Sequence, residues 1–392
     1  MAWRNVSPME ERVRFIFEAQ LGLWTMTELC ERYGISRKTG YKWQKRFNEQ
    51  GVDGIREYSR APKHCPHRTP EEVVKRVLEE RQRHPKWGPK KIAQALKRCG
   101  DPFQVPAAST IGGILQRHGL VRRRRRPRGA VRRWPGSLTQ PQRANHVWGV
   151  DFKGWFRTGN GQRCDPLTAS DLYSRFVLGC RALRGQTTQV VRPVFEKIFT
   201  QYGVPEVIRV DNGAPFGSRG ACGLTKLSMW WVQLGIRVEF IEPGHPEQNA
   251  VHERMHRTLK DETCCPPKWT HRAQQRRFDQ WRREFNLERP HEGLGMRCPA
   301  EVYRPSTMAY SKVPKAFSYP RFFEVRRVRE AGQISFNGKP RFIGHAFSGI
   351  NVGLEPISSE KRLVHAGPLV IGTIAEQGEQ TMQPTLGRPT SN

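Results

Sequence analysis

Short apolar periods separated by capping residues dominate the first 60 residues. Apolar side chains recur at helical spacing over residues 9–21. Thr27 is placed to cap a second short helix, and Ser36 to cap a third over residues 37–47. A tight turn containing glycine separates the last two helices, and the third helix begins with basic residues. This order is the helix-turn-helix pattern; a small helical bundle with a solvated basic face is the alternative.

Residues 69–120 repeat the same pattern. Pro70, in the first helical position, and the two acidic residues after it predict a helix that runs to about His84. A second helix is expected over residues 90–98, and a third begins at Ala108. The segment therefore predicts a second helix-turn-helix domain.

From about residue 143 the spacing changes to alternating strands and helices. The pattern predicts strands over 146–152, 167–173, 175–183, 207–210 and 238–241, and helices over 187–202, 224–234, 248–263 and 272–287. Three strands followed by alternating helices and strands are typical of an α/β domain with a mixed sheet. This order fits the ribonuclease H-like fold.

After about residue 315, short apolar segments are separated by Gly, Pro, Asn or Ser, which predicts a small SH3-like β barrel. We expect the last residues to be disordered. The predicted organisation is a helix-turn-helix domain (1–60), a second one (69–120), a basic linker (121–142), an α/β core (143–305), a small β domain (315–376) and a tail (377–392).

The charge balance indicates the kind of partner. The formal net charge is +31 and the mean hydropathy is −0.69. So basic a chain points to a polyanion, most commonly nucleic acid. No apolar run is long enough to cross a membrane and the N-terminus lacks a signal peptide, so we expect a cytoplasmic, nucleoid-associated protein without a membrane partner. The nine cysteines are scattered, which predicts reduced thiols, and His64-Cys65-Pro66-His67 is only a weak zinc cluster.

Candidate DNA contacts come from both helical domains and from the linker. The dense run of arginines in the linker repels itself and is suited to following phosphates; a solvated tail or a localisation signal is the alternative reading of this run. The expected DNA-binding residues in these regions are Arg37, Lys38, Thr39, Lys42, Ser109, Arg122, Arg123, Arg124, Arg125 and Arg126.

Two aspartates and one glutamate are the candidates for catalysis. Asp151 lies at the end of the first strand of the α/β region, and Asp211 ends the fourth strand. Carboxylates at strand ends meet at the carboxyl edge of a sheet. Glu253 lies one turn into a later helix, which can hold its side chain opposite both strand ends. Glu247, in the turn before that helix, is the rival for the third acid, and Asp171 has at most a supporting role.

Three carboxylates are suited to phosphoryl transfer with two Mg²⁺ ions, for which Mn²⁺ can substitute. Two ions about 3.5–4 Å apart stabilise both the entering and the leaving oxygen of an in-line displacement. Mg²⁺ prefers oxygen ligands and keeps several waters, so a few carboxylates suffice. We expect Asp151 to bridge the two ions.

The motifs together resemble bacterial insertion-sequence transposases, whose catalytic domain is similar to that of retroviral integrases. The resemblance rests on Asp151 within Trp148–Phe152, on Asp211-Asn212-Gly213, and on the segment PGHPEQNAVHERMHRTLKDE over residues 243–262. Asn-x-x-Arg-Pro-His follows at residues 286–291. The resemblance covers most of the chain. Asp211 lies 60 positions after Asp151, and Glu253 a further 42 on, which is longer than the compact integrase pattern; the extra residues fall in 217–224.

The resemblance also implies a DNA-facing side of the Glu253 helix. Arg257 and Lys260 follow Glu253 at i+4 and i+7, on the same face, and the resemblance implies that they hold the element's end beside the metals. His256, at i+3, is a further candidate contact. A solvated basic face is the alternative.

The chain is therefore expected to be a DNA transposase. It would bind its element's terminal inverted repeats, cut the 3′ ends with metal-activated water, and join the 3′-hydroxyl to target DNA. Since two ends must be held together, we expect at least a dimer. The alternative is a catalytically inactive helix-turn-helix regulator. A remote alternative comes from His252-Glu253-Arg254-Met255-His256, which matches the HExxH signature of zinc proteases but leaves Asp151 and Asp211 unexplained.

Overall fold

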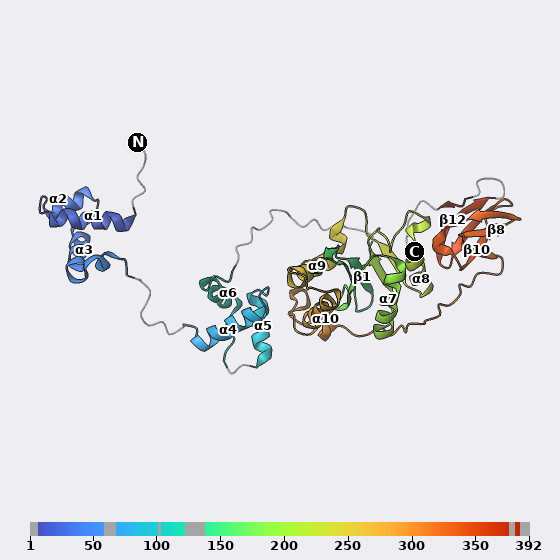
Figure 1. Ribbon diagram of the computed structural model, residues 1–392, viewed down its shortest axis with the longest axis horizontal. Coiled ribbons are helices and arrows are strands. Elements are labelled where there is room, and N and C mark those ends of the chain that lie inside the picture. The colour runs from blue at the N-terminus through green and yellow to red at the C-terminus, as the bar shows by residue number, and fades with distance from the viewer. Residues whose placement is uncertain (1–6, 59–67, 101–102, 122–137, 376–380, 385–392) are drawn as a thin grey trace. The chain divides into compact units, whose positions relative to one another are not determined.

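The computed structural model describes residues 7–58, 68–100, 103–121, 138–375 and 381–384 (Figure 1). The chain forms two compact units, Met1–Thr69 and Pro70–Asn392. The arginines Arg122–Arg126 and the cluster His64–His67 lie outside the described residues. All eight cysteines within the described ranges are free thiols. No helix in those ranges combines the length and the apolar character needed to cross a membrane.

The first unit contains helices α1 (Pro8–Gln20), α2 (Met26–Arg32) and α3 (Arg37–Gln50), followed by the 3-10 turn η1 (Gly51–Ile55). Each helix begins at a hydroxyl cap, because the side chains of Ser7, Thr25 and Ser36 accept a hydrogen bond from the backbone N–H three residues on. Ser36 is confirmed as a cap. Thr27 is not, because Thr25 and Glu28 form a capping box two residues earlier.

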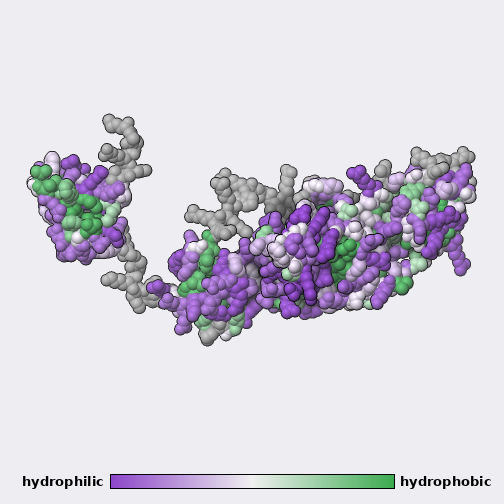
Figure 2. Space-filling model, in the orientation of Figure 1, coloured by the Kyte–Doolittle hydropathy of each residue, from purple (hydrophilic) through white to green (hydrophobic). Residues whose placement is uncertain are grey.

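The core of this unit is small and tightly packed. Phe15, Leu29 and Trp43 are buried together. At Gly40, helix α3 passes so close to α2 that a Cβ atom would lie 2.6 Å from the Cys30 sulfur, which explains the glycine. Figure 2 shows hydrophobic surface on this unit. Its large exposed hydrophobic residues include Phe17, Leu21, Leu23 and Trp24.

A second bundle of three helices opens the second unit, with α4 (Glu71–Arg83), α5 (Pro89–Cys99) and α6 (Ala108–Arg117). Pro70 is the cap residue of α4 rather than its first helical residue. The three helices bury a common core that includes Val77, Ile92 and Ile111. Both helix-turn-helix regions are therefore folded around their own hydrophobic cores.

The α/β core is built on a mixed sheet, as predicted. Its strands are β1 (Val147–Phe152), β2 (Phe156–Arg157), β3 (Arg163–Asp171), β4 (Val177–Leu183), β5 (Val207–Val210) and β6 (Arg237–Phe240). The order is β2-β3-β1-β5-β6, and β4 pairs with β3. β1 runs antiparallel to β3 and parallel to β5, which is parallel to β6.

Helices cover both faces of this sheet (Figure 1). They are α7 (Thr188–Tyr202), α8 (Lys226–Gln233), α9 (Ala250–Leu259), α10 (His271–Leu287) and α11 (Pro299–Val302), with the short turns η2 (Ala221–Gly223), η3 (Pro246–Asn249), η4 (Lys260–Cys264, a π-helix) and η5 (Glu292–Leu294). Strand β4 contributes to both layers: Leu178 packs with α7 and α8, whereas Val177 and Cys180 pack with α9 and α10. A register shift opposite Ala169 and Ser170 sets Val177 and Cys180 on the same face. The sheet with its two helical layers is the ribonuclease H-like core.

Within the described residues, the C-terminal strands do not form the closed barrel that was expected. The strands are β7 (Glu324–Arg327), β8 (Gln333–Phe336), β9 (Lys339–Phe342), β10 (Asn351–Pro356), β11 (Lys361–Ala366), β12 (Leu369–Ala375) and β13 (Gln383–Pro384), with the 3-10 turn η6 (His345–Phe347). Within the described residues they make a five-stranded sheet, β13-β12-β11-β10-β7, and a separate hairpin, β8-β9. β13 lies within the expected disordered tail and pairs with β12.

The extra residues of the loop 217–224 pack against this C-terminal sheet. Cys222 Sγ lies 3.4 Å from the Val370 carbonyl oxygen, and Ala221, Cys222 and Leu224 are buried in the same cluster as residues of β10 and β12. The longer spacing between Asp211 and Glu253 therefore provides a contact to the β domain.

Candidate active site

Asp151 and Asp211 lie on neighbouring parallel strands. β1 pairs with β5 in a register that sets Gly149 opposite Arg209. Two residues further along, the same register sets Asp151 beside Asp211, which directly follows β5. Residues two apart on a strand face the same side of a sheet. The equal spacing on both strands therefore brings these two carboxylates together at the carboxyl edge.

Glu253 reaches this edge from α9. The loop before the helix is fixed to the sheet, since the Glu242 N–H donates to Gln248 Oε1 at 2.8 Å. The buried Arg209 on β5 ties the same loop to the sheet by a hydrogen bond to the Gln248 carbonyl and an ion pair with Glu239. Glu253 lies in the first turn of α9 and is exposed. The side chain of its rival Glu247 lies outside the described residues.

The carboxylates repel one another. Burial raises the pKa of Asp151 to about 7, and the negative charges of Asp211 and then Glu253 add to this increase. Burial also raises the pKa of Asp211, opposed by a hydrogen bond from the Gly213 backbone. Like charges gathered in a partly buried place favour either a proton or a cation between them.

The two histidines of the HExxH sequence are buried beneath this edge. His252 Nε2 and His256 Nε2 lie 2.8 and 2.7 Å from the hydroxyl oxygen of Thr168, which also donates to the Asp151 carbonyl at 3.0 Å. The Nδ1 atom of His252 is 2.9 Å from Ser170 Oγ. Burial lowers the pKa of both imidazoles, that of His252 to about 3, so both are neutral.

This network argues against a zinc-protease site. The Thr168 hydroxyl occupies the place where both Nε2 atoms would have to meet a zinc ion. His256, which was also predicted to contact DNA, is only 1% exposed here and packs against β3. Sequence reasoning missed Thr168 and Ser170, since nothing in the chain around them distinguishes them from other strand residues.

The donor set suits a divalent metal ion. Asp151, Glu253 and His256 each offer a ligand atom, and these atoms lie within 4.8 Å of one another. His256 Nδ1 is 3.7 Å from Asp151 Oδ2, too far for a hydrogen bond. Asp211 lies outside this trio, but its negative charge adds to the rise in the pKa of Asp151.

Models of known protein families match the helical regions and the α/β core. A helix-turn-helix domain family matches residues 11–63, a homeodomain-like family matches 39–115, and integrase core domain families match 141–246 and 234–299. The chain is 30% identical over 206 residues to the insertion element IS407 uncharacterized 31.7 kDa protein of Burkholderia multivorans, covering 52% of this chain and 71% of that protein. This chain belongs to the insertion-sequence transposases with an integrase-like core.

Two further likenesses extend the comparison. The transposase is 29% identical over 244 residues to the insertion element IS476 uncharacterized 39.2 kDa protein of Xanthomonas euvesicatoria, covering 61% of this chain and 67% of that protein. Among solved structures, the HTLV-2 integrase catalytic core domain in complex with magnesium aligns over 42% of this chain and all of that domain, at 14% identity and a TM-score of 0.34.

Other predicted DNA contacts of the transposase are accessible. Arg257 and Lys260 are exposed at the end of α9 and at the start of η4. The first turns of α3 expose Arg37, Lys38 and Lys42, with Thr39 partly covered by its hydrogen bond to Ser36; Ser109 is exposed at the start of α6.

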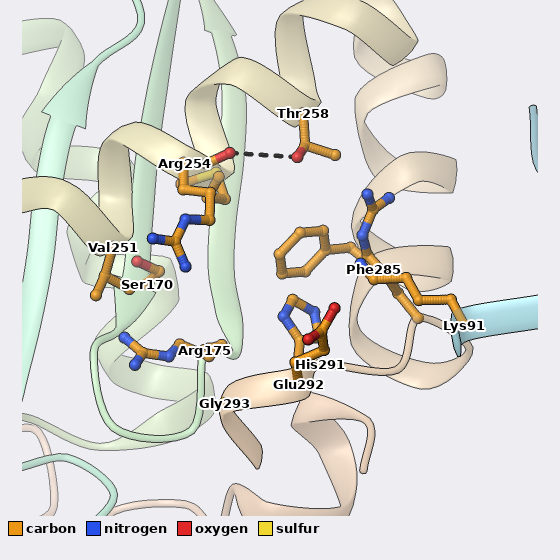
Figure 3. Close-up of a pocket in the computed structure, with 12 residues that line it drawn as sticks. Lys91, Ser170, Arg175, Val251, Arg254, Thr258, Phe285, His291, Glu292 and Gly293 are labelled. Atoms are coloured by element: carbon orange, nitrogen blue, oxygen red, sulfur yellow. Dashed lines mark hydrogen bonds between the residues drawn. The ribbon is translucent and has the colours of Figure 1, made fainter. Parts of the chain in front are cut away.

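The side of α9 away from the acids borders a basic pocket of about 340 Å³ (Figure 3). Arg254, Arg175, Arg289 and Lys91 line it with Phe285 and His291, among others. Burial, and then the nearby charge of Arg254, lower the pKa of Arg175. Arg289 is paired with Glu262 at 2.8 Å.

The Asn-x-x-Arg-Pro-His motif supports the fold beside this pocket. Asn286 bridges α10 to β4, accepting from the Val177 N–H and donating to the Val177 carbonyl. Arg289 donates a hydrogen bond to Glu262 in the middle of η4. The motif was recognisable in the sequence, but its packing role depends on the tertiary contacts.

Proposed function

We propose that this transposase cuts the ends of its element and joins the freed 3′-hydroxyl to target DNA, with Asp151, Asp211 and Glu253 as its catalytic carboxylates. The observation that carries the proposal is the position of Asp151 and Asp211 on adjacent parallel strands, opposite Glu253 on α9. Burial, and then the negative charges of Asp211 and Glu253, raise the pKa of Asp151 to about 7. Such a collection of acids is expected where divalent cations complete a site.

The carboxylates fit two Mg²⁺ ions, for which Mn²⁺ can substitute. The charges of both Asp211 and Glu253 act on Asp151. Asp151 would therefore be the ligand that both ions share. When bound, the ions would activate the attacking water or hydroxyl and neutralise charge on the phosphate. Asp211 and Glu253 would each hold one side of the site. The Thr168 hydroxyl fixes the Asp151 backbone from β3.

The basic parts of the chain would bind the DNA and hold it beside the acids. Arg257 and Lys260 follow Glu253 on one face of the helix and are exposed, so they are placed to neutralise phosphates of the element's end. The two helix-turn-helix domains would bind the terminal inverted repeats. Because both ends must be cut and joined together, the working form would be at least a dimer.

The direct test uses Asp151→Asn, Asp211→Asn and Glu253→Gln in the full chain. The substrates are duplexes that carry the element's own ends, with Mg²⁺ or Mn²⁺. Each variant should lose 3′-end nicking and strand transfer while it keeps end binding in a mobility-shift assay. Retained joining in any one variant would remove that residue from the site.

Glu247→Gln is the matched control. It removes the rival carboxylate and should leave nicking within a few-fold of the wild type. If the wild-type chain binds ends specifically but never nicks them with either metal, the proposal fails and the protein is a DNA-binding regulator.

A further inference from the structure

The hydroxyl of Thr168 makes three contacts but has only one proton to give. Its oxygen lies 3.0 Å from the Asp151 carbonyl oxygen, 2.8 Å from His252 Nε2 and 2.7 Å from His256 Nε2. A carbonyl can only accept. All three contacts are satisfied together when Thr168 donates to the carbonyl and accepts an N–H from each imidazole.

This assignment fixes the tautomers of both neutral rings. Each carries its proton on Nε2, so each Nδ1 is an acceptor with a free electron pair. His252 Nδ1 has a donor, the Ser170 hydroxyl at 2.9 Å. His256 Nδ1 instead faces Asp151 Oδ2, another acceptor, at 3.7 Å. Two acceptors that face each other in this largely buried place favour either a proton or a cation between them.

We propose that His256 Nδ1 is a metal ligand, which together with Asp151 and Glu253 makes one of the two metal positions a mixed nitrogen and oxygen site. The inference rests on the proposed function. Atoms that share one ion at about 2.1 Å are at most about 4.2 Å apart. The separation of 3.7 Å between Nδ1 and Oδ2 meets that limit. The three side chains already lie close enough for small movements to bring them around one ion.

The spacing on α9 agrees with this assignment. Glu253 and His256 are Glu-x-x-His, the i, i+3 arrangement by which one helix presents a carboxylate and an imidazole to the same ion in di-iron helical bundles. The HExxH sequence therefore divides into two parts. His252 is structural, with both ring nitrogens occupied by protein hydroxyls, whereas Glu253 and His256 face the acids.

A nitrogen ligand changes which metals the site prefers. Imidazole suits transition metals, whereas Mg²⁺ and Ca²⁺ prefer oxygen alone. The Thr168 hydroxyl acts as a supporting contact that fixes the ring and aims Nδ1 at the ion. The site should therefore bind Mn²⁺ more tightly than Mg²⁺, and truncation of His256 should weaken Mn²⁺ binding by at least about tenfold while Ca²⁺ binding changes little.

Pulsed electron paramagnetic resonance on the Mn²⁺-loaded full chain tests the assignment without an activity measurement. Imidazole coordination gives an echo modulation from the bound ¹⁴N nucleus. We expect this modulation in the wild type, its loss in His256→Ala, and its retention in His118→Ala, a matched histidine of the second helical bundle. Modulation that is absent from the Mn²⁺-loaded wild type, or that persists in folded His256→Ala, would overturn the proposal.

Two further measurements keep the test decisive. If circular dichroism shows that His256→Ala does not fold, wild-type protein grown on ¹⁵N-histidine replaces it: the modulation must change to that of ¹⁵N, and an unchanged signal refutes imidazole ligation. Asp151→Asn separates the two proposals. Mn²⁺ binding that survives this substitution counts against the carboxylate site itself, whereas binding that depends on Asp151 but lacks nitrogen modulation counts against His256 alone.

Discussion

Helix α9 separates two regions of opposite charge. On one face, Glu253 lies near Asp151 and Asp211, and the negative charges of these three acids repel one another. On the other, Arg254 shares a pocket with Arg175 and Arg289 (Figure 3). The difference lies in the counter-charges. Arg289 forms an ion pair with an acidic residue of the protein at 2.8 Å. The nearest charges that shift the pKa of Asp151 are instead those of other acids, so they repel it. The pocket is therefore partly neutralised within the protein, whereas the charges nearest to Asp151 are mainly those of other acids.

The largest expected effect contrasts two adjacent residues of α9. Glu253→Gln should lower strand joining by on the order of 10³-fold, because it removes a charge that stabilises the reacting phosphate through the metal. Arg254→Gln, one position on and bordering the basic pocket, should leave strand joining within a few-fold of the wild type. Gel-based strand-transfer assays measure both; equal losses would mean that the two faces are not functionally distinct.

In the metal-free protein, the repulsion among the acids should make the stability of the fold depend on pH. The pKa of Asp151 is about 7 in the fold against an ordinary 3.8, so the folded state retains a proton that the unfolded state has lost between these values. Stability should therefore fall by up to a few kcal/mol as pH rises from about 4 to 7, and level off above.

Thermal melts in EDTA at pH 5 and pH 8 measure this loss. Asp151→Asn should remove its own share of the decrease and raise the melting temperature at pH 8. Adding Mg²⁺ at pH 8 should stabilise the wild type but not the variant. A melting temperature that does not change between the two pH values in the wild type would contradict the charge repulsion.

The hydroxyl at the base of the acidic edge should matter for stability. Thr168→Val keeps the branched shape but leaves two buried imidazole N–H groups without an acceptor, which costs about 1–3 kcal/mol. Urea denaturation gives the difference. Thr200→Val is the matched control, because Thr200 is exposed and its hydroxyl only bonds back to Glu196 on the same helix. Similar costs for both would show that the imidazole contacts contribute nothing.

The smallest effect is expected in the basic pocket. Arg254→Gln removes a like charge near the half-buried Arg175, so the free energy of unfolding should be unchanged or increase by about 0.5 kcal/mol. Arg289→Gln should instead destabilise the protein, because it leaves the partly buried Glu262 without its partner. Urea denaturation at low and high salt checks the pair. A clear loss of stability in Arg254→Gln would mean that this guanidinium is held by favourable contacts.

The local elements were largely predictable because they depend on short-range patterns. The cap at Ser36 and strand β5 agree with the expected positions, since capping and apolar periodicity act within a few residues. Strand β2 and the C-terminal arrangement were not predicted. β2 has two residues and exists only because it pairs with β3, and whether a set of short strands closes into a barrel depends on long-range register.

The sequence alone predicted the three acids as a set, since the strands and the helix that carry them, and their order along the chain, are local properties. It also determined the basic helical regions that point to DNA. Only the tertiary structure decided what the HExxH sequence means. His252 and His256 look equivalent on a helix, but the hydroxyls of Thr168 and Ser170 come from a strand more than 80 residues earlier. Those hydroxyls occupy both nitrogens of one ring and leave Nδ1 of the other facing Asp151, because hydrogen bonds between distant segments are set by packing and not by local pattern.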